Sequence, residues 1–379
     1  MLVSVKDSIK FIGVTVVCFC AVFVCTFFLN YYLDIVPLEA DISEDVMPLY
    51  KAQLATAQMT CGITGGFLSV IAVIMLLFYI KLYIDAHGKE IGTFKAMGYS
   101  DSEIAGSFTV FGLGAFIGCA LGFGIGWTFM PTIYNQLAID GLPEITVRFH
   151  PSLLFALVVA PAVVFTVLAY VYGIIILRKP ALAIMRGTPT KTKKVKHKTD
   201  AKNRPFLKEF CLSALGSKKT LVFWITFSCF CFSAMVQMGL SMENLASGTM
   251  AVMILIIGLV LAFISMFMAM TSLVKENAKN IAVMKAMGFS VRERFAAVFV
   301  GYIPFAVLGF AIGTVYQFGL LQLMINVIFN AVGEIPAYTF DVPVFFYTLF
   351  MFAVAYSAVF AVYLIKTNRI PVKMIMTEN

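Results

Sequence analysis

Cysteine and histidine are the residues of this 379-residue chain whose types could bind a metal or act as nucleophiles. Four of the eight cysteines form two C-x-C pairs, Cys18/Cys20 and Cys229/Cys231. On a helix, side chains two residues apart point to different faces, so neither pair is well placed to chelate one ion. All cysteines but Cys211 fall in apolar runs, where a thiol behaves as a small apolar group. We therefore expect no metal centre and no disulfide framework.

The sequence also lacks the motifs of a nucleotide-binding site or a hydrolase. The string ALGSKKT at 214–220 lacks the first glycine of the phosphate-binding loop G-x-x-x-x-G-K-[ST]. There is no nucleophile elbow and no H-E-x-x-H string, and the three histidines form no constellation; His150 is interpreted as a loop residue. We expect that the chain is not an enzyme and binds no cofactor of its own.

The most informative feature is a short string that occurs twice. KAMGYS at 95–100 returns as KAMGFS at 285–290. Around each copy, apolar residues recur every three positions and lysines lie away from them, which is typical of a short amphipathic helix. The apolar residues are Ile91, Phe94 and Met97, then Ile281, Met284 and Met287; the lysines are Lys89 and Lys95, then Lys279 and Lys285.

Each amphipathic segment is followed by a stop and a new start. Gly98 and Gly288 stand where a helix commonly ends, because glycine adopts positive φ without strain. The strings SDSE at 100–103 and SVRE at 290–293 then match the capping box that opens a helix. The sequence therefore predicts two rigid elbows of defined angle. We call them the first elbow, residues 89–103, and the second elbow, residues 279–293.

Membrane spans are the elements that must position these elbows. Hydrophobic residues make up 61% of the chain and charged residues 13%, against about 25% charged in soluble proteins. Apolar runs of about 20 residues mark helices that cross a bilayer. The first run is interpreted as a retained anchor, since no small-residue cleavage site follows it. Eight runs are predicted, near residues 11–31, 58–80, 106–130, 152–177, 221–240, 249–273, 295–321 and 343–365.

The placement of lysine and arginine predicts the orientation. The segments expected in the cytoplasm hold 26 of the 28 basic residues, which puts both termini and both elbows inside. The densest basic run, at 191–198, is interpreted as a linker attracted to lipid headgroups, and no nucleic-acid partner is expected. The cytoplasmic segments are 1–10, 81–103, 178–219, 274–294 and 366–379.

The repeat extends beyond the elbows to the end of each half. We predict an all-α integral membrane protein with eight transmembrane helices, arranged as two parallel four-helix repeats with cytoplasmic termini and a minimal extracellular domain. The outer segment at 32–57 is expected to be an acidic loop. The predicted division is a first repeat at 1–187, a basic linker at 188–205 and a second repeat at 206–379.

Glycines in two of the spans predict close packing of helices. Small residues drive helix association in lipid, where no hydrophobic drive between helices exists. The glycines are Gly114, Gly118, Gly122 and Gly126 in the third span and Gly309 and Gly313 in the seventh.

No charged residue is expected in the middle of a span, which argues against an ion-coupled carrier.

The elbow sequences resemble the FtsX-like permease family, also called MacB-type or type VII ABC permeases. The match is KEIGTFKAMGYSDSEI at 89–104 and, more loosely, KNIAVMKAMGFSVRER at 279–294. The resemblance covers most of 58–187 and 249–379 and includes RKPALAIMRG at 178–187.

The resemblance implies a partner and a mechanism. In that family, the segments that match 89–98 and 279–288 are coupling helices, which dock on a separate cytoplasmic ATPase that binds the ATP. Two elbows then imply two ATPase copies per chain, in a bacterial plasma membrane. Glu90 is replaced by Asn280 in the second copy, so the two contacts are expected to be unequal.

Two functions remain open at this point. Family members relay ATP-driven closure of their ATPases across the membrane; some extrude peptides or lipoproteins or resist antimicrobial peptides, and others activate cell-wall hydrolases. They usually carry a sizeable outer domain, whereas the outer segments expected here are short. The chain is therefore expected to move an amphipathic peptide or lipid-like molecule, or else to act as a mechanotransmitting regulator of a hydrolase or sensor.

Overall fold

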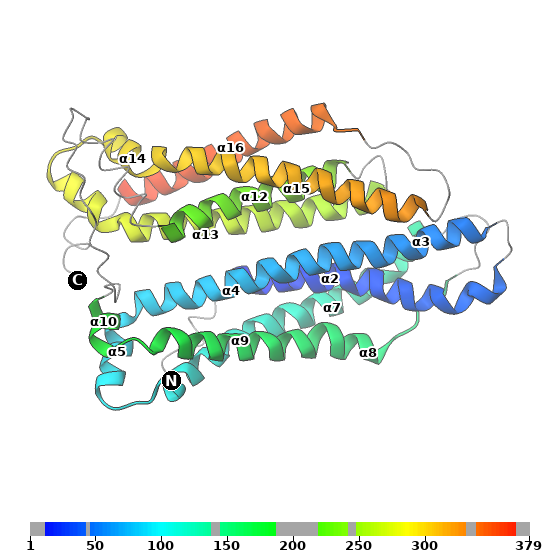
Figure 1. Ribbon diagram of the computed structural model, residues 1–379, viewed down its shortest axis with the longest axis horizontal. Coiled ribbons are helices and arrows are strands. Elements are labelled where there is room, and N and C mark those ends of the chain that lie inside the picture. The colour runs from blue at the N-terminus through cyan, green and yellow to red at the C-terminus, as the bar shows by residue number, and fades with distance from the viewer. Residues whose placement is uncertain are drawn as a thin grey trace. The chain divides into compact units, whose positions relative to one another are not determined.

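The computed structural model describes residues 12–42, 46–137, 145–186, 219–241, 248–330 and 339–368. Within these ranges the regular structure is helical, without strands (Figure 1). Among the described residues, eight helical stretches are long and apolar enough to cross a membrane, as predicted. They are Ile12–Glu39, Gly66–Asp85, Asp101–Asn135, Pro151–Leu177, Leu221–Ser241, Leu255–Val274, Val300–Leu323 and Val342–Tyr363.

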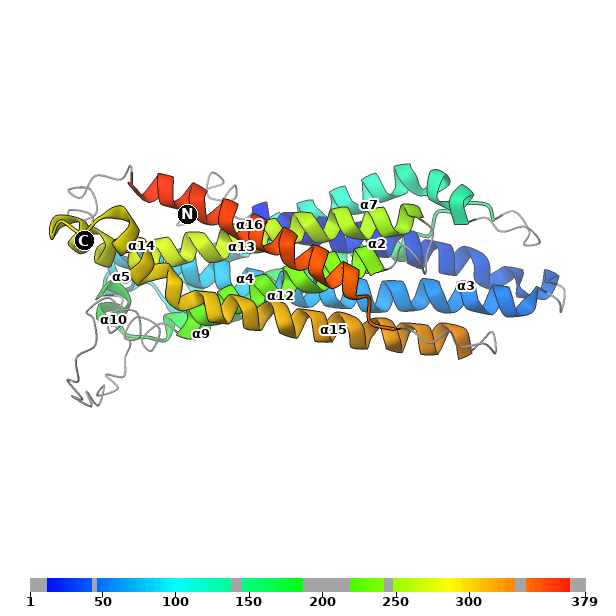
Figure 2. The same ribbon diagram turned by 90° about the horizontal axis from the view of Figure 1, so that it is seen from above.

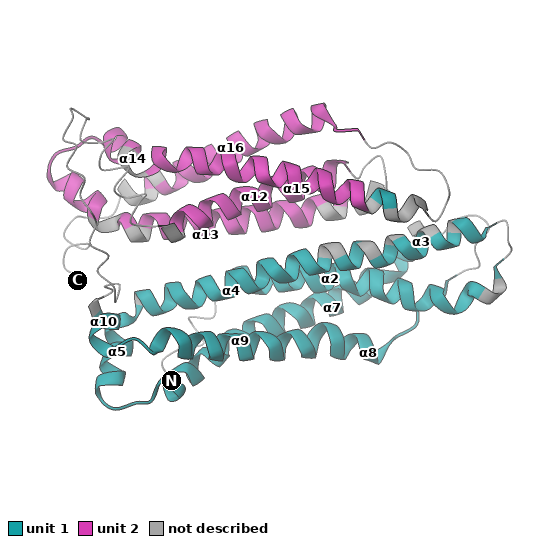
Figure 3. Cartoon of the chain, in the orientation of Figure 1, with its two compact units in different colours: residues 1–195, 324–336 teal, residues 196–323, 337–379 magenta. Residues whose placement is uncertain are grey.

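The chain forms two compact units, shown in separate colours in Figure 3. Unit 1 comprises residues 1–195 and 324–336, and unit 2 comprises residues 196–323 and 337–379. The linker predicted at 188–205 lies outside the described residues. Within each unit the long helices run roughly along one direction, as Figure 2 also shows.

Unit 1 is built around four long helices. They are α2 (Ile12–Ile35), α4 (Gly66–Ala86), α7 (Val110–Leu137) and α9 (Ala160–Leu177). At one end of these helices lie the short helices α5 (Gly88–Ala96) and α10 (Ala181–Arg186), and at the other end lie α3 (Met47–Thr60) and α8 (Pro151–Leu154) (Figure 1). The short segments α6 (Asp101–Gly106), η4 (Ser107–Thr109) and η5 (Phe155–Val159) also belong to the unit.

The helix α2 packs along α7, and the predicted glycines lie in that contact. A Cβ added at Gly118 would stand 2.3 Å from the carbonyl oxygen of Thr15, and one at Gly122 would stand 2.5 Å from that of Phe19. Gly114 and Gly126 lie farther along the same contact, where an added Cβ would be 3.3 Å from a threonine side-chain atom. The absence of side chains therefore lets the two backbones approach closely.

Unit 2 repeats this close contact between α12 and α15. A Cβ at Gly309 would lie 2.2 Å from the carbonyl oxygen of Thr226, and one at Gly313 would lie 2.7 Å from that of Phe230. The core of the unit is apolar and includes the buried side chains of Phe232, Phe299 and Phe310. Its helices are α12 (Lys219–Ser241), α13 (Gly248–Ala286), α14 (Val291–Phe299), η7 (Val300–Tyr302), α16 (Val342–Asn368) and the part of α15 (Ile303–Asn330) up to Leu323.

The prediction of a loop at 32–57 was wrong for its described residues, which are mostly helical. The helix α2 extends to Ile35, η2 (Val36–Asp41) follows, and α3 continues through a π-helical turn, η3 (Cys61–Gly65), into α4. Both η2 and α3 have proline in their first turn, where a missing backbone N–H costs nothing. Tertiary packing also holds α3: Tyr50 is buried and its hydroxyl donates to the carbonyl of Ile35.

Candidate functional site

The helical conformation is interrupted just before the first elbow. The helix α4 ends at Ala86, His87 has φ −109° and ψ 23°, and α5 starts at Gly88. Two glycines then bring α5 against α10. A Cβ at Gly88 would lie 2.7 Å from the carbonyl oxygen of Ile184, and one at Gly92 would lie 2.2 Å from Cγ of Met185.

The glycine stops predicted in both elbows are confirmed. Gly98 has φ +97° and Gly288 has φ +85°, and these are the positive-φ glycines among the described residues. In the first elbow, the N–H of Tyr99 donates to the carbonyl of Phe94 at 3.2 Å; in the second, the N–H of Phe289 donates to Met284 at 3.1 Å. This is the Schellman arrangement, which satisfies the last carbonyls of a helix.

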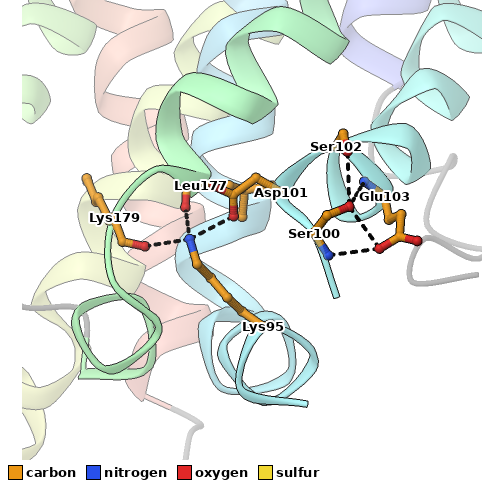
Figure 4. Close-up of polar contacts among 7 residues, drawn as sticks. All are labelled: Lys95, Ser100, Asp101, Ser102, Glu103, Leu177 and Lys179. Carbon is orange, nitrogen blue, oxygen red and sulfur yellow. Dashed lines mark hydrogen bonds and ion pairs between the residues drawn. The ribbon is translucent and has the colours of Figure 1, made fainter. Parts of the chain in front are cut away.

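The capped restarts are confirmed as well. The Ser100 hydroxyl accepts from the N–H of Glu103 at 3.3 Å, and the Glu103 carboxylate accepts from the N–H of Ser100 at 2.8 Å (Figure 4). Ser290 and Glu293 repeat both bonds, at 3.3 Å and 2.9 Å. The hydrogen bonds from the Ser290 side chain and backbone hold the pKa of Glu293 below its ordinary value. In each elbow, a helix thus ends at a glycine of positive φ, and a capping box fixes the start of the next helix.

The three apolar positions of each elbow do not share one environment. The third position is exposed in both copies: Met97 is 61% exposed and Met287 is 57% exposed. Because these methionines follow the last helical turn, they do not contribute to the packed face, and they are open to a partner. The packed positions, buried or half-buried, are Ile91, Phe94, Ile281 and Met284.

The charged candidates also differ among themselves. Lys89 and Glu90 are exposed on α5. The ammonium of Lys95 is instead bound within the chain: it donates to the carbonyls of Leu177 and Lys179 and pairs with Asp101 (Figure 4). Lys95 is therefore held by contacts within unit 1, whereas Lys89 is exposed.

The second elbow departs from the first. No separate helix precedes its glycine, because α13 continues without a break from Gly248 to Ala286. Ala278 occupies the position of Gly88, and Asn277 occupies that of His87, where its buried amide donates to the carbonyl of Leu273 at 2.9 Å. Lys285 is half-buried, and the side chain of Lys279 lies outside the described part of the chain. In this copy the expected short helix is therefore the last part of α13, which continues beyond the span Leu255–Val274.

A polar cluster at the far end of unit 1 escaped the sequence interpretation. Asp34 is 8% exposed and lies inside α2 rather than in a loop. Its carboxylate accepts from Asn30 at 2.8 Å, from the Tyr134 hydroxyl at 2.8 Å and from the N–H of Arg148 at 3.3 Å. His150, interpreted as a loop residue, lies 2.8 Å from the same carboxylate. The Asn30-x-x-x-Asp34 spacing, one helical turn, was the available signal.

Cysteines pair across helices rather than within the C-x-C strings. Cys18 of α2 lies beside Cys119 of α7, and Cys25 lies beside Cys61. All cysteines in the described ranges are free thiols, and Cys211 lies outside those ranges.

Comparison with known proteins points to one family. The family described as FtsX-like permease C-terminal matches the chain twice, at residues 62–181 and 252–372. These two stretches include both elbows and together make up more than half of the chain. Searches of curated proteins and of solved structures returned no significant match.

Proposed function

Because the chain belongs to the FtsX-like permease family, we propose that it is the membrane subunit of an ABC-type complex and that a separate ATPase drives it. It is a multi-pass membrane protein, and members of its family are membrane permease components rather than enzymes. On this proposal ATP is bound by the partner and not by this chain.

The repeated elbow is the observation that carries the proposal. Each copy presents an exposed methionine, Met97 or Met287, directly before a glycine held in the left-handed region. After one intervening residue, a capping box begins and fixes the direction of the next helix. A protein that binds the exposed side therefore acts on a joint of defined angle. Such a joint would allow the bound protein to move the packed helices as rigid bodies, which is one of the ways in which proteins switch.

Two elbows on one chain support two ATPase sites. On the predicted topology both elbows face the cytoplasm, so two ATPase copies would bind one chain and change the separation of the elbows as they close. The exposed pair Lys89 and Glu90 would add charged contacts in the first elbow, whereas the second has Asn280 at the position of Glu90. The two contacts are therefore unequal in charge.

Purification of the intact chain tests the class of protein. The full-length protein, extracted in a mild detergent from the cells that produce it naturally, is expected to carry a soluble ATPase at about two copies per chain. Substitution of both exposed methionines by aspartate is expected to remove that ATPase while the chain still inserts. Wild-type protein that carries no ATPase in several detergents would contradict the proposal.

The short outer segments are the basis for our proposal of what the complex acts on at the outer side of the membrane. A membrane-embedded substrate, such as an amphipathic peptide or a lipid-like molecule, requires no large outer domain. Loss of the gene is then expected to change resistance to membrane-active peptides. The second candidate, regulation of a cell-wall hydrolase or sensor, predicts a defect in division or shape without that change.

A further inference from the structure

The two elbows are joined to their membrane spans in different ways. In unit 1 the helical conformation is interrupted at His87, between α4 and α5. A break at the end of an element is where hinges absorb changes in φ and ψ, so a displacement of α5 would be lost in part at this point. In unit 2 the helix α13 runs through the corresponding position, and a displacement would pass directly into the span. The first elbow therefore needs another route into the bilayer.

Backbone contact with α10 provides the first part of that route. The helix α5 lies against α10 at Gly88 and Gly92, where the missing side chains leave room for the backbone of Ile184 and the side chain of Met185. A Cβ at Gly92 would also stand 3.1 Å from the carbonyl oxygen of Ala181, the first residue of α10. Only residues 178–180 separate α10 from the end of α9. The two short helices are thus packed as one body beside the end of the fourth span.

Lys95 provides the second part. Its ammonium donates to the carbonyl of Leu177, the fully buried last residue of α9, and to the carbonyl of Lys179 at 2.9 Å. It also lies 2.7 Å from the carboxylate of Asp101, the first residue of α6 (Figure 4). A lysine has three hydrogen-bond donors, and three acceptors surround it here. The carbonyls at a helix C-terminus carry partial negative charge, which favours a cation at this point.

We propose that Lys95 is the joint through which the first elbow moves the fourth span, α9. It is a positioning residue and not a contact for the ATPase, because its donors are already used and its side chain is only 20% exposed. The second elbow has Val291 where Asp101 stands, so it cannot form the same ion pair, and the unbroken α13 carries the motion there. This inference rests on the proposed function for its direction of motion, but the joint itself can be tested on the chain alone.

Amide hydrogen exchange on the full-length protein in lipid nanodiscs tests the joint. Lys95→Ala is expected to raise the exchange of amides in 89–98 by roughly tenfold or more, since hydrogen bonds to charged groups are the strong ones. Lys95→Arg, which keeps a charged donor, is expected to retain most of the protection. Lys89→Ala is the matched control, because it removes the same charge from the exposed side of the same helix.

Coupling is measured on the complex with the ATPase that co-purifies. Lys95→Ala is expected to keep the ATPase bound at wild-type stoichiometry but to reduce the ratio of ATP turnover in the complex to that of the separated ATPase several-fold. Lys89→Ala is expected to lower ATPase occupancy instead. Reduced turnover at normal occupancy indicates a residue that transmits motion, whereas reduced occupancy indicates a residue that contacts the ATPase.

Three results would overturn the inference. They are unchanged exchange in Lys95→Ala, a loss of ATPase occupancy in Lys95→Ala equal to that in Lys89→Ala, and raised exchange with unchanged ATP turnover. If the wild-type chain carries no ATPase at all, the proposed function fails, and the exchange experiment still decides whether the joint exists.

Discussion

The elbow glycine and the packing glycine of unit 1 should respond differently to the same substitution. Gly98 has φ +97°, and a Cβ added there meets no atom within 4 Å, so the cost is one of backbone conformation alone. Gly118 lies inside α7, and its added Cβ would be 2.3 Å from a backbone oxygen of α2. The first position rejects side chains because of φ, and the second rejects them because of space.

The magnitudes follow from these two causes. The left-handed conformation costs a residue with a Cβ about 1–2 kcal/mol, which lowers the population of the stopped elbow by about 5- to 30-fold in Gly98→Ala. Asparagine, which tolerates this conformation, should cost less, and β-branched valine should cost more. Ordinary contact begins at 3.4 Å, so Gly118→Ala must separate α2 from α7 by about 1 Å. Overpacking of this kind costs about 1–3 kcal/mol.

Amide hydrogen exchange in nanodiscs distinguishes the two causes, because each should raise the exchange rate in a different segment of the chain. The Gly98 series should raise exchange at residues 95–101 in the order asparagine, alanine, valine, with α2 unaffected. Gly118→Ala should raise exchange in α2 and α7 and leave the elbow protected. The Gly288 series is the matched copy in unit 2, with φ +85° and the same open space. Equal effects of all three residues at Gly98, or wild-type protection in Gly118→Ala, would refute this explanation.

The remaining predictions concern the polar cluster of unit 1 and the cap of the second elbow. Tyr134→Phe removes a donor to the buried carboxylate of Asp34 and an acceptor for the Asn30 amide, and it should destabilise unit 1 by about 1.5–3 kcal/mol, measured as a lower thermal unfolding midpoint. Tyr31→Phe, which removes only a bond to a neutral amide, should cost less, and an equal cost would contradict the role of charge. Ser290→Ala should weaken the restart of α14 by about 1 kcal/mol, seen as faster exchange at its first turn. The folded-state pKa of Glu293 is depressed, so its contribution to the cap is present above the ordinary glutamate pKa and is lost as the pH falls through the folded value. The wild-type cap should therefore weaken only in acid, and Glu293→Gln should remove that pH dependence; a cap that weakens towards alkaline pH would show that the sign is wrong.

Local signals in the sequence predicted the parts of the elbows that depend on local chemistry. A glycine after an amphipathic turn predicted positive φ at Gly98 and Gly288, and S-x-x-E predicted both capping boxes. Runs of apolar residues likewise predicted the eight spans. These features depend on residues within one or two turns of each other, so they can be recognised without knowledge of the fold.

Features that depend on distant partners were not predictable in this way. Lys95 looked like a polar surface residue, because its acceptors on Leu177 and Lys179 lie more than 80 positions away in the sequence. Asp34 looked like part of an acidic loop, because Tyr134 and His150, which satisfy it, follow it by 100 or more positions. At the second elbow, the similarity of the two strings led to the prediction of a separate short helix. The structure has an interrupted helix in the first copy and a continuous helix in the second.

The mass of the intact complex tests the central claim most directly. Native mass spectrometry of the full-length protein, released from its own membrane with its partners, is expected to show one chain with two identical ATPase subunits. Replacement of Met97 alone by aspartate should leave a species with one ATPase, because Met287 still presents the second site. A wild-type chain that carries no ATPase, or a single-site variant that keeps both copies, would contradict the account.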